Sequence, residues 1–198
     1  MTFSSQDALV LASGSPYRKA LLDQLRLPYS VCSADIDESP RNGELPVALA
    51  TRLACQKALA VVSRFPESII IGADQVATLD GVVAFSKPQD HAGAVAQLEA
   101  ASGRTATFYS AAVVLNARTH VERHVVVPTE VRYRKLTRSR IERYLRLDRP
   151  YDCAGSARIE ALGIALVEWV RSDDPSALLG LPLIALVDLL AAEGIQPL

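Results

Sequence analysis

The chain has 198 residues, of which 49% are hydrophobic and 22% are charged, and its formal net charge is -1. This composition argues against a disordered chain and fits one globular domain with a sizeable core. A nearly neutral protein lacks the basic surface that general nucleic-acid binding requires. No signal peptide and no bilayer-spanning apolar stretch is recognisable, so we expect a cytoplasmic protein without membrane or nucleic-acid partners.

The first predicted elements are a strand over the apolar run 9–12, a loop of Ser13-Gly14-Ser15 and a helix that begins at Pro16. Ser15 is a suitable N-cap residue for this helix. Arg18 and Lys19 fall in the first turn, where the helix dipole disfavours cations. Hydroxyl groups, free backbone N–H groups and two cations around one helix start indicate a phosphate-binding site. An ordinary turn with solvated basic side chains is the alternative.

The rest of the chain predicts alternating helices and strands. We expect a strand over 29–34, a helix over 46–65, a strand over 68–74, a hairpin over 76–85, a helix over 91–101, two long paired strands over 105–116 and 121–133, a helix over 137–147, a loop at 153–156, a strand over 163–170 and a helix over 182–193. This order predicts a mixed α/β fold around a central sheet.

Asp74 is the strongest catalytic candidate, because it follows the most hydrophobic predicted strand. Ligands of α/β sheets bind at the carboxyl ends of strands, and a carboxylate buried there needs a cation, a ligand or a hydrogen-bond donor. An Asp that merely starts a turn is the alternative. Lys57 and Lys87 are candidate phosphate partners, although each alone reads as a surface lysine.

A metal, if one is used, should be bound by oxygen atoms. The three cysteines and three histidines show no ligand spacing and no C-x-x-C motif, so a disulfide framework or a structural zinc is not expected. Carboxylates suit Mg²⁺ or Mn²⁺, and Glu38, which closes an acidic segment at 35–38, is a candidate ligand together with Asp74. A solvated acidic loop is the alternative for Glu38.

Several motifs along the chain together resemble those of the Maf family of nucleotide pyrophosphatases. They are Ser13-Gly14-Ser15-Pro16-Tyr17-Arg18, Asp37-Glu38, Arg52-Leu53-Ala54-Cys55-Gln56-Lys57-Ala58, Ile71-Gly72-Ala73-Asp74-Gln75, Lys87-Pro88, Ala101-Ser102-Gly103 and Gly180-Leu181-Pro182. The resemblance implies one domain over 1–198, with a fold similar to the inosine triphosphate pyrophosphatases and two lobes around a cleft. It also implies hydrolysis of a nucleoside triphosphate to the monophosphate and pyrophosphate with a divalent cation, Mg²⁺ or Mn²⁺, and it makes a homodimer one expectation.

Three departures from the common family pattern bear on the substrate. Tyr17 stands where many members have an arginine, Gln75 where they have a threonine, and Glu160 where they have a glutamine. These residues resemble the subgroup of 7-methyl-GTP pyrophosphatases. Ser86 replaces a common family glycine, so the resemblance does not predict the backbone conformation before Lys87.

The chemistry of 7-methylguanine gives these residues a function. Methylation at N7 makes the base cationic, and an aromatic ring such as Tyr17 attracts a cation by about 0.5–2 kcal/mol. Glu160 could accept hydrogen bonds from guanine N1–H and the exocyclic amine. A packing aromatic and a surface carboxylate are the alternatives.

The resemblance therefore predicts Asp74 as the catalytic residue, acting on water as base, metal ligand or both, with Glu38 as a second metal ligand. It predicts a set of substrate-binding residues, namely Ser13, Ser15, Tyr17, Arg18, Lys57, Gln75, Lys87 and Glu160. Two alternatives remain at this stage. One is a pyrophosphatase for dTTP, UTP or another nucleotide, and the other is a nucleotide sensor that regulates cell division without hydrolysis.

Overall fold

The computed structural model describes residues 8–85, 88, 90–151 and 153–198. Within these residues, six strands form one sheet in the order β2-β1-β3-β4-β5-β6. The strands are β1 (Leu9–Leu11), β2 (Ser30–Val31), β3 (Ile69–Thr78), β4 (Thr105–Asn116), β5 (Val121–Tyr133) and β6 (Val167–Ser172). β1 runs parallel to β2 and β3, whereas the pairs β3–β4, β4–β5 and β5–β6 are antiparallel. The sheet is therefore mixed, as the sequence predicts.

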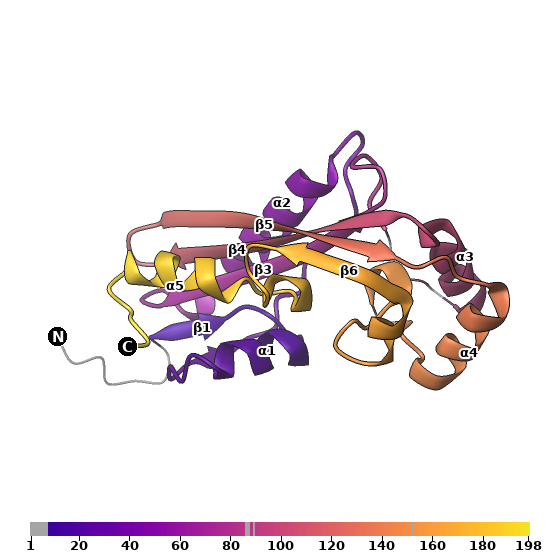
Figure 1. Cartoon of the computed structure of the whole chain (residues 1–198). Helices are drawn as coiled ribbons and strands as arrows, with labels where there is room; N and C mark the ends of the chain where they lie inside the picture. The colour runs from indigo at the N-terminus through magenta and orange to yellow at the C-terminus, as the bar shows by residue number, and fades with distance from the viewer. Residues whose placement is uncertain (1–7, 86–87, 89, 152) are drawn as a thin grey trace.

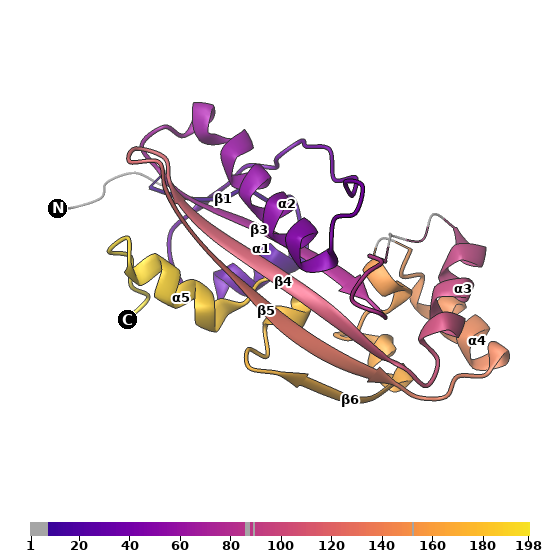
Figure 2. The ribbon, with the colours of Figure 1, turned by 90° about the horizontal axis from the view of Figure 1, so that it is seen from above.

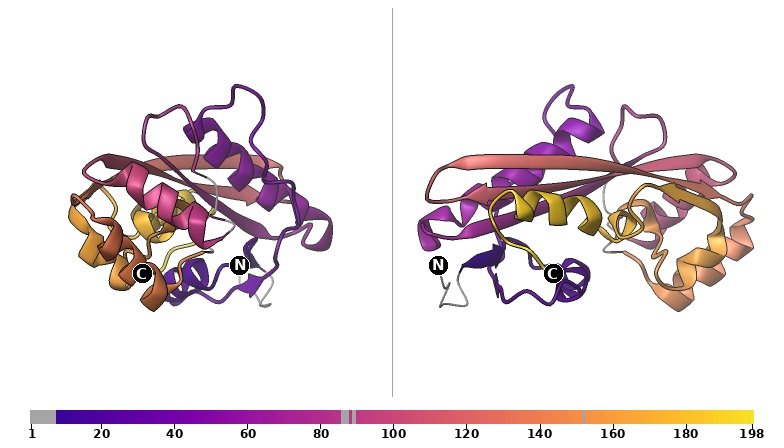
Figure 3. Two further views of the ribbon diagram at one scale, coloured as in Figure 1. Left: turned by 90° about the vertical axis from the view of Figure 1, so that its right-hand side faces the viewer. Right: turned by 60° about the vertical axis from the view of Figure 1, so that its left-hand side comes forward.

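Helices cover both faces of this sheet and its far end (Figures 1 and 2). They are α1 (Pro16–Asp23), α2 (Pro46–Ala60), α3 (His91–Ala101), α4 (Arg138–Asp148) and α5 (Leu183–Ala191). α2 lies on one face, and α1 and α5 lie on the opposite face, as both views of Figure 3 show. α3 and α4 pack against each other where the long strands β4 and β5 reach the other end of the molecule.

The alternation of side chains along β3 explains why both faces are covered. Successive residues of a strand point to opposite faces. Ile70 accordingly packs in the cluster under α2, whereas Ile71 packs in the cluster formed with α1 and α5. A third cluster joins α3 and α4 to the ends of β4 and β5 and includes Leu98, Ile141 and Tyr133. Three apolar clusters thus hold the two ends of the molecule on one sheet.

The structure confirms several expected elements. The long strands at 105–116 and 121–133 and the helix at 91–101 have the predicted bounds. Thr137 caps α4, and its hydroxyl accepts a hydrogen bond from the Arg140 N–H. Across the described part of the chain, no helix is both long enough and apolar enough to span a bilayer.

The prediction that a strand ends at Asp74 is wrong. β3 continues to Thr78, because its antiparallel pairing with β4 extends from Ile69 opposite Asn116 to Thr78 opposite Thr107. The expected hairpin over 76–85 is reduced to one isolated bridge between Thr78 and Ala84. Val82 and Val83 are 62% and 65% exposed, so the expected second strand of this hairpin has no apolar partner at these two residues.

Three other bounds also differ from the prediction. The strand expected over 29–34 is limited to Ser30–Val31, and the helix expected over 46–65 ends at Ala60, before a short 3-10 turn. The strand expected over 163–170 starts only at Val167. A Cβ at Gly163 would lie 2.3 Å from the Arg158 carbonyl oxygen, so the chain here folds back on itself instead of extending.

Candidate active site

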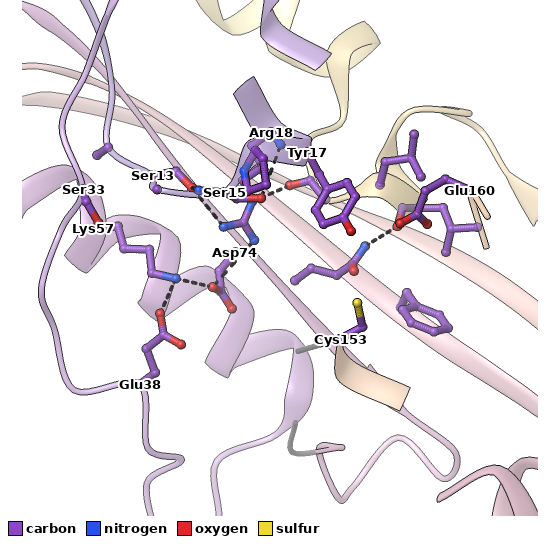
Figure 4. Close-up of a pocket in the computed structure, with 18 of the residues that line it drawn as sticks. Ser13, Ser15, Tyr17, Arg18, Ser33, Glu38, Lys57, Asp74, Cys153 and Glu160 are labelled. Atoms are coloured by element: carbon purple, nitrogen blue, oxygen red, sulfur yellow. Dashed lines mark hydrogen bonds and ion pairs between the residues drawn. The ribbon is translucent and has the colours of Figure 1, made fainter. Parts of the chain in front are cut away.

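One pocket of about 500 Å³ lies where the loop after β1, the middle of β3 and the segments around 153–160 and 178–180 meet. This volume lies within the range of small-molecule sites. The predicted site residues that the structure describes all line it: Ser13, Ser15, Tyr17, Arg18, Glu38, Lys57, Asp74, Gln75 and Glu160. Figure 4 shows two ends, with Arg18, Lys57, Asp74 and Glu38 on one side and Tyr17, Cys153 and Glu160 on the other.

Asp74 reaches this pocket because its neighbouring strand is short. β1 ends at Leu11, opposite Ile71 of β3, so no strand lies beside Asp74 on that side. The loop of Ser13-Gly14-Ser15 follows there instead. Asp74 thus lies in the middle of β3 but beyond the carboxyl end of β1. The predicted position of Asp74 at the end of its own strand is therefore wrong. Asp74 lies instead beyond the carboxyl end of the neighbouring strand β1.

Gly72 brings α2 close enough for Lys57 to reach Asp74. A Cβ at Gly72 would lie 2.1 Å from the Ala54 carbonyl oxygen and 3.0 Å from Ala58. Only a glycine allows this approach between helix and strand. Lys57 sits next to Ala58 on α2, and Asp74 lies two residues after Gly72 on the same face of β3. The contact between backbones therefore sets the position of the charged pair.

Lys57 binds two carboxylates. Its Nζ lies 2.6 Å from Asp74 Oδ1 and 2.6 Å from Glu38 Oε1 (Figure 4). The side chains of Lys57 and Asp74 are each 9% exposed, whereas that of Glu38 is 47% exposed. Buried charges of this kind must be paired. The pair is the buried centre of the pocket, and Glu38 links it to the surface.

Arg18 approaches Asp74 from the opposite face of the sheet. Its Nη2 lies 3.9 Å from Asp74 Oδ1, its Nη1 donates to Ser13 Oγ at 3.3 Å, and its Nε donates to the Gly180 carbonyl at 2.9 Å. Burial lowers the pKa of Arg18, and the carboxylates of Asp74 and Glu38 oppose that shift. Several fixed acceptors therefore orient a buried guanidinium toward the pocket.

The loop before α1 has the predicted geometry, with one correction. Ser15 is the N-cap of α1, and its hydroxyl accepts the Arg18 N–H at 3.4 Å. A Cβ at Gly14 would lie 3.1 Å from Ser33 Oγ, so Gly14 leaves room for a second hydroxyl at the pocket wall. Lys19 does not share the site. It pairs with Asp23 one turn away at 2.9 Å, on the exposed side of α1.

Gln75 points to the face opposite Asp74 and is held by protein acceptors. Its Nε2 lies 2.9 Å from Ser110 Oγ, 3.0 Å from the Ala177 carbonyl and 2.9 Å from the Leu178 carbonyl. Carbonyls only accept, so the amide nitrogen must face them. The amide oxygen is then the atom of Gln75 that can face a ligand.

The other end of the pocket is built from turns. Glu160 is exposed and lies in a turn closed by the Ala161 N–H, which donates to the Arg158 carbonyl at 3.1 Å. Arg158 fastens this turn to α4 through the Asp148 carbonyl at 3.0 Å, and its N–H donates to the Tyr144 hydroxyl. Tyr17 is half-buried on the first turn of α1 and faces this end (Figure 4).

The charges that line the pocket favour a cationic partner. Among the described lining residues, three carboxylates, Glu38, Asp74 and Glu160, outnumber the two cations Arg18 and Lys57. Arg18 and Lys57 are paired with Asp74 and Glu38, so these described residues leave no excess positive charge for a bare triphosphate, and a divalent cation would supply it. The described residues form no cluster of three or more metal-ligating His, Cys, Asp or Glu side chains. Two carboxylates plus substrate oxygens nevertheless form a usual donor set for Mg²⁺.

Comparison with known proteins identifies the family. A family model described as Maf-like protein matches residues 8–193. The chain belongs to the Maf-like protein family. It is 52% identical to the 7-methyl-GTP pyrophosphatase of Methylobacillus flagellatus over 188 residues, which cover 95% of this chain and 97% of that protein. The 7-methyl-GTP pyrophosphatase of Cupriavidus metallidurans is 48% identical over 194 residues, or 98% and 97% of the two chains.

Two further similarities complete the comparison. The 7-methyl-GTP pyrophosphatase of Bordetella avium is 50% identical to this Maf-like chain over 190 residues, or 96% and 95% of the two chains. Among solved structures, the Ham1 protein of Staphylococcus aureus aligns with a TM-score of 0.47 and 14% identity, over 64% of this chain and 72% of that one.

The sequence predicted many of the residues that line this Maf-like pocket, but it did not predict all of them. Lys87 lies outside the described residues, so its predicted role stays a prediction. Ser33 and Phe108 line the pocket and were not expected there. Ser33 was expected inside the strand over 29–34, but β2 ends at Val31, so Ser33 lies in the loop after that strand as Ser13 does after β1. Phe108 lies inside a long buried strand and had no signal in the sequence.

Proposed function

We propose that this chain hydrolyses 7-methyl-GTP to 7-methyl-GMP and pyrophosphate. The observation that carries the proposal is the pocket itself, in which a buried centre of Lys57, Asp74 and Arg18 faces a second end with Tyr17 and Glu160. The proposal is supported by relatives of 48% to 52% identity that are named 7-methyl-GTP pyrophosphatases. The two ends suit the two parts of such a nucleotide.

In this proposal the buried end binds the triphosphate. Arg18 and Lys57 donate hydrogen bonds to phosphate oxygens, and the backbone N–H groups at the start of α1 add positive partial charge. Asp74 acts on the attacking water, as base, as ligand of a divalent cation, or as both. The water oxygen forms a bond to the α-phosphorus while the bond to the bridging α–β oxygen breaks, and pyrophosphate leaves with that oxygen.

Asp74 and Glu38 would hold the divalent cation, Mg²⁺ or Mn²⁺, beside the triphosphate. Bound there, such a cation would neutralise phosphate charge and polarise the reacting groups. The protein positions both carboxylates through Lys57, which contacts each of them at 2.6 Å.

The other end would recognise the base. Tyr17 offers an aromatic surface to the cationic 7-methylguanine ring. Glu160 accepts hydrogen bonds from its N1–H and exocyclic amine, and its negative charge complements the methylated ring. Uracil and thymine lack this pair of donors, so the same carboxylate disfavours them.

The test is pyrophosphate release by the purified protein across 7-methyl-GTP, GTP, ITP, UTP, dTTP and CTP, with Mg²⁺ or Mn²⁺. We expect 7-methyl-GTP to have the highest kcat/KM, about 2- to 30-fold above GTP from the cation–π term. Asp74→Asn, purified in parallel, controls for contaminating phosphatases. Preference for UTP or dTTP would overturn the substrate assignment, and binding without release would favour the nucleotide sensor.

A further inference from the structure

The buried carboxylate of Asp174 has no place in the mechanism above. It is 2% exposed, lies outside the lining of the pocket and contacts no cation through any salt bridge found among the described residues. A buried carboxylate is costly unless donors surround it. Its donors all belong to one loop, which runs from the end of β6 to the start of α5.

Asp174 and Ser176 together close this loop. Asp174 Oδ1 accepts the Ser176 N–H at 3.0 Å and the Ser176 hydroxyl at 2.6 Å. Asp174 Oδ2 accepts the Ile184 N–H at 2.8 Å, and Ser176 Oγ accepts the Leu183 N–H at 2.7 Å. The N-cap position of α5, Pro182, has no side-chain acceptor of its own. The two side chains therefore bind the first N–H groups of α5 from ten and seven residues upstream.

The loop that they close carries the acceptors for two pocket residues. The Gly180 carbonyl accepts from Arg18 Nε at 2.9 Å. The Ala177 and Leu178 carbonyls accept from Gln75 Nε2 at 3.0 and 2.9 Å. Gly180 has a φ of +98°, a left-handed backbone conformation that residues other than glycine rarely adopt. A shift of this loop would therefore move Arg18 and Gln75 together.

We propose that Asp174 and Ser176 are positioning residues, which set the orientation of Arg18 and Gln75 by fixing the carbonyls of residues 177, 178 and 180. The inference rests on the proposed function for its kinetic readout. Arg18 contacts the triphosphate before and during the reaction, so its misplacement weakens binding in both states. The expected signature is a raised KM with little change in kcat.

The test compares Asp174→Asn with Asp188→Asn. Asp188 is an exposed carboxylate on the same helix, α5, so its variant removes an equal charge without touching the loop. An asparagine at 174 has one acceptor oxygen and cannot satisfy both Ser176 and Ile184. We expect its KM for 7-methyl-GTP to rise about tenfold, as for loss of one hydrogen bond to a charged group, with kcat within threefold. Asp188→Asn should match the wild type.

Ser176 provides an independent second variant. Ser176→Ala should raise KM as Asp174→Asn does, whereas Ser176→Thr keeps the hydroxyl and should restore most of the loss. A purely structural defect would instead lower the active fraction, which reduces the apparent kcat and leaves KM unchanged. That pattern, or a threonine variant as impaired as the alanine one, would overturn the proposal.

A double-mutant cycle with Arg18→Lys tests whether the effect travels through Arg18. Lysine lacks the planar guanidinium group with which Arg18 donates to the Gly180 carbonyl and to Ser13 Oγ at the same time. In that background Asp174→Asn should raise KM less than threefold, and a full tenfold rise would overturn the coupling.

If no nucleotide is hydrolysed, the proposed function is wrong, but the positioning role of Asp174 and Ser176 can still be tested by binding. Calorimetric binding of inorganic pyrophosphate with Mg²⁺ then replaces kinetics. Asp174→Asn should weaken its Kd about tenfold relative to Asp188→Asn, and equal Kd values would overturn the positioning role.

Discussion

The two ends of the pocket are built in different ways. At the end that we propose binds phosphate, the phosphate end, Arg18 and Lys57 come from α1 and α2, and their charged groups lie 3.9 and 2.6 Å from the carboxylate of Asp74 on β3. At the proposed base end, Glu160 lies on an exposed turn, which the backbone and side chain of Arg158 attach to α4. Regular elements fix geometry, whereas loops tolerate substitution without disturbing the core. The difference predicts that hydrolysis and substrate choice can be altered separately.

The largest effect should follow Asp74→Asn. The substitution keeps the shape of the side chain but removes the charge that pairs with Lys57 and that we propose acts on water. General-base or ligand roles of this kind contribute about 10²- to 10⁴-fold, so kcat for every hydrolysed nucleotide should fall by that factor. Steady-state pyrophosphate release measures it, with Asp188→Asn as the control. Turnover within tenfold of the wild type would remove Asp74 from the chemistry.

Gly72→Ala should affect stability and hydrolysis together. A Cβ there would lie 2.1 Å from the Ala54 carbonyl, so α2 must move away from β3 and carry Lys57 with it. Overpacking of this kind costs about 1–3 kcal/mol of unfolding free energy, occasionally more. Urea denaturation measures this cost, and pyrophosphate release should fall for all nucleotides equally.

A companion variant sharpens that result. Ala58→Gly removes the side-chain contact near Gly72 but leaves the backbone oxygen of Ala54, so it should not rescue Gly72→Ala. Full rescue would mean that the helix–strand distance is not what places Lys57.

At the phosphate end, the features that depend on neighbouring residues could be predicted from the sequence, whereas the contacts between distant segments could not. The start of α1 at Pro16 and the cap at Ser15 depend on neighbouring residues alone, and the structure confirms both. Asp74 was expected at a strand end, because nothing local reveals that β4 extends the pairing past it. Gln75 and Arg18 take their acceptors from residues 177–180, far along the chain. Such contacts depend on topology, which hydrophobic periodicity does not encode.

Glu160→Gln should change substrate choice and leave hydrolysis intact. It removes the charge that complements a methylated ring, while glutamine still fits the exposed turn. We expect kcat/KM for 7-methyl-GTP to fall about tenfold, near the low end for hydrogen bonds to charged groups because this site is exposed. The values for UTP and dTTP should stay level or rise.

Tyr17→Leu should lower 7-methyl-GTP selectivity by a smaller factor. For either variant, equal losses of kcat/KM for all nucleotides would contradict the separation of the two ends.

The smallest effect concerns the attachment of α2, which carries Lys57. Arg52 of α2 binds both oxygens of Glu44 at 2.6 and 2.7 Å, and the Arg41 N–H donates to Glu44 at 3.0 Å. These hydrogen bonds, chiefly those from Arg52, lower the pKa of Glu44 to about 2. In the unfolded chain the same carboxyl binds a proton at its ordinary pKa of 4.5. The stabilisation is therefore complete above that value and is lost as the pH falls toward 2.

Glu44→Gln cannot titrate, so the difference between the two proteins should depend on pH. Urea midpoints of the wild type and Glu44→Gln should differ at pH 7 and converge as the pH falls from about 4.5 toward 2. Asp37, whose pKa is lowered mainly by hydrogen bonds from Ser39 and to a smaller extent by Arg52, is present in both proteins, so most of its contribution cancels in the comparison. Since Glu44 does not line the pocket, kcat/KM at pH 7 should change less than about twofold. A difference that stays constant with pH would mean that Arg52 stabilises α2 without the charge of Glu44.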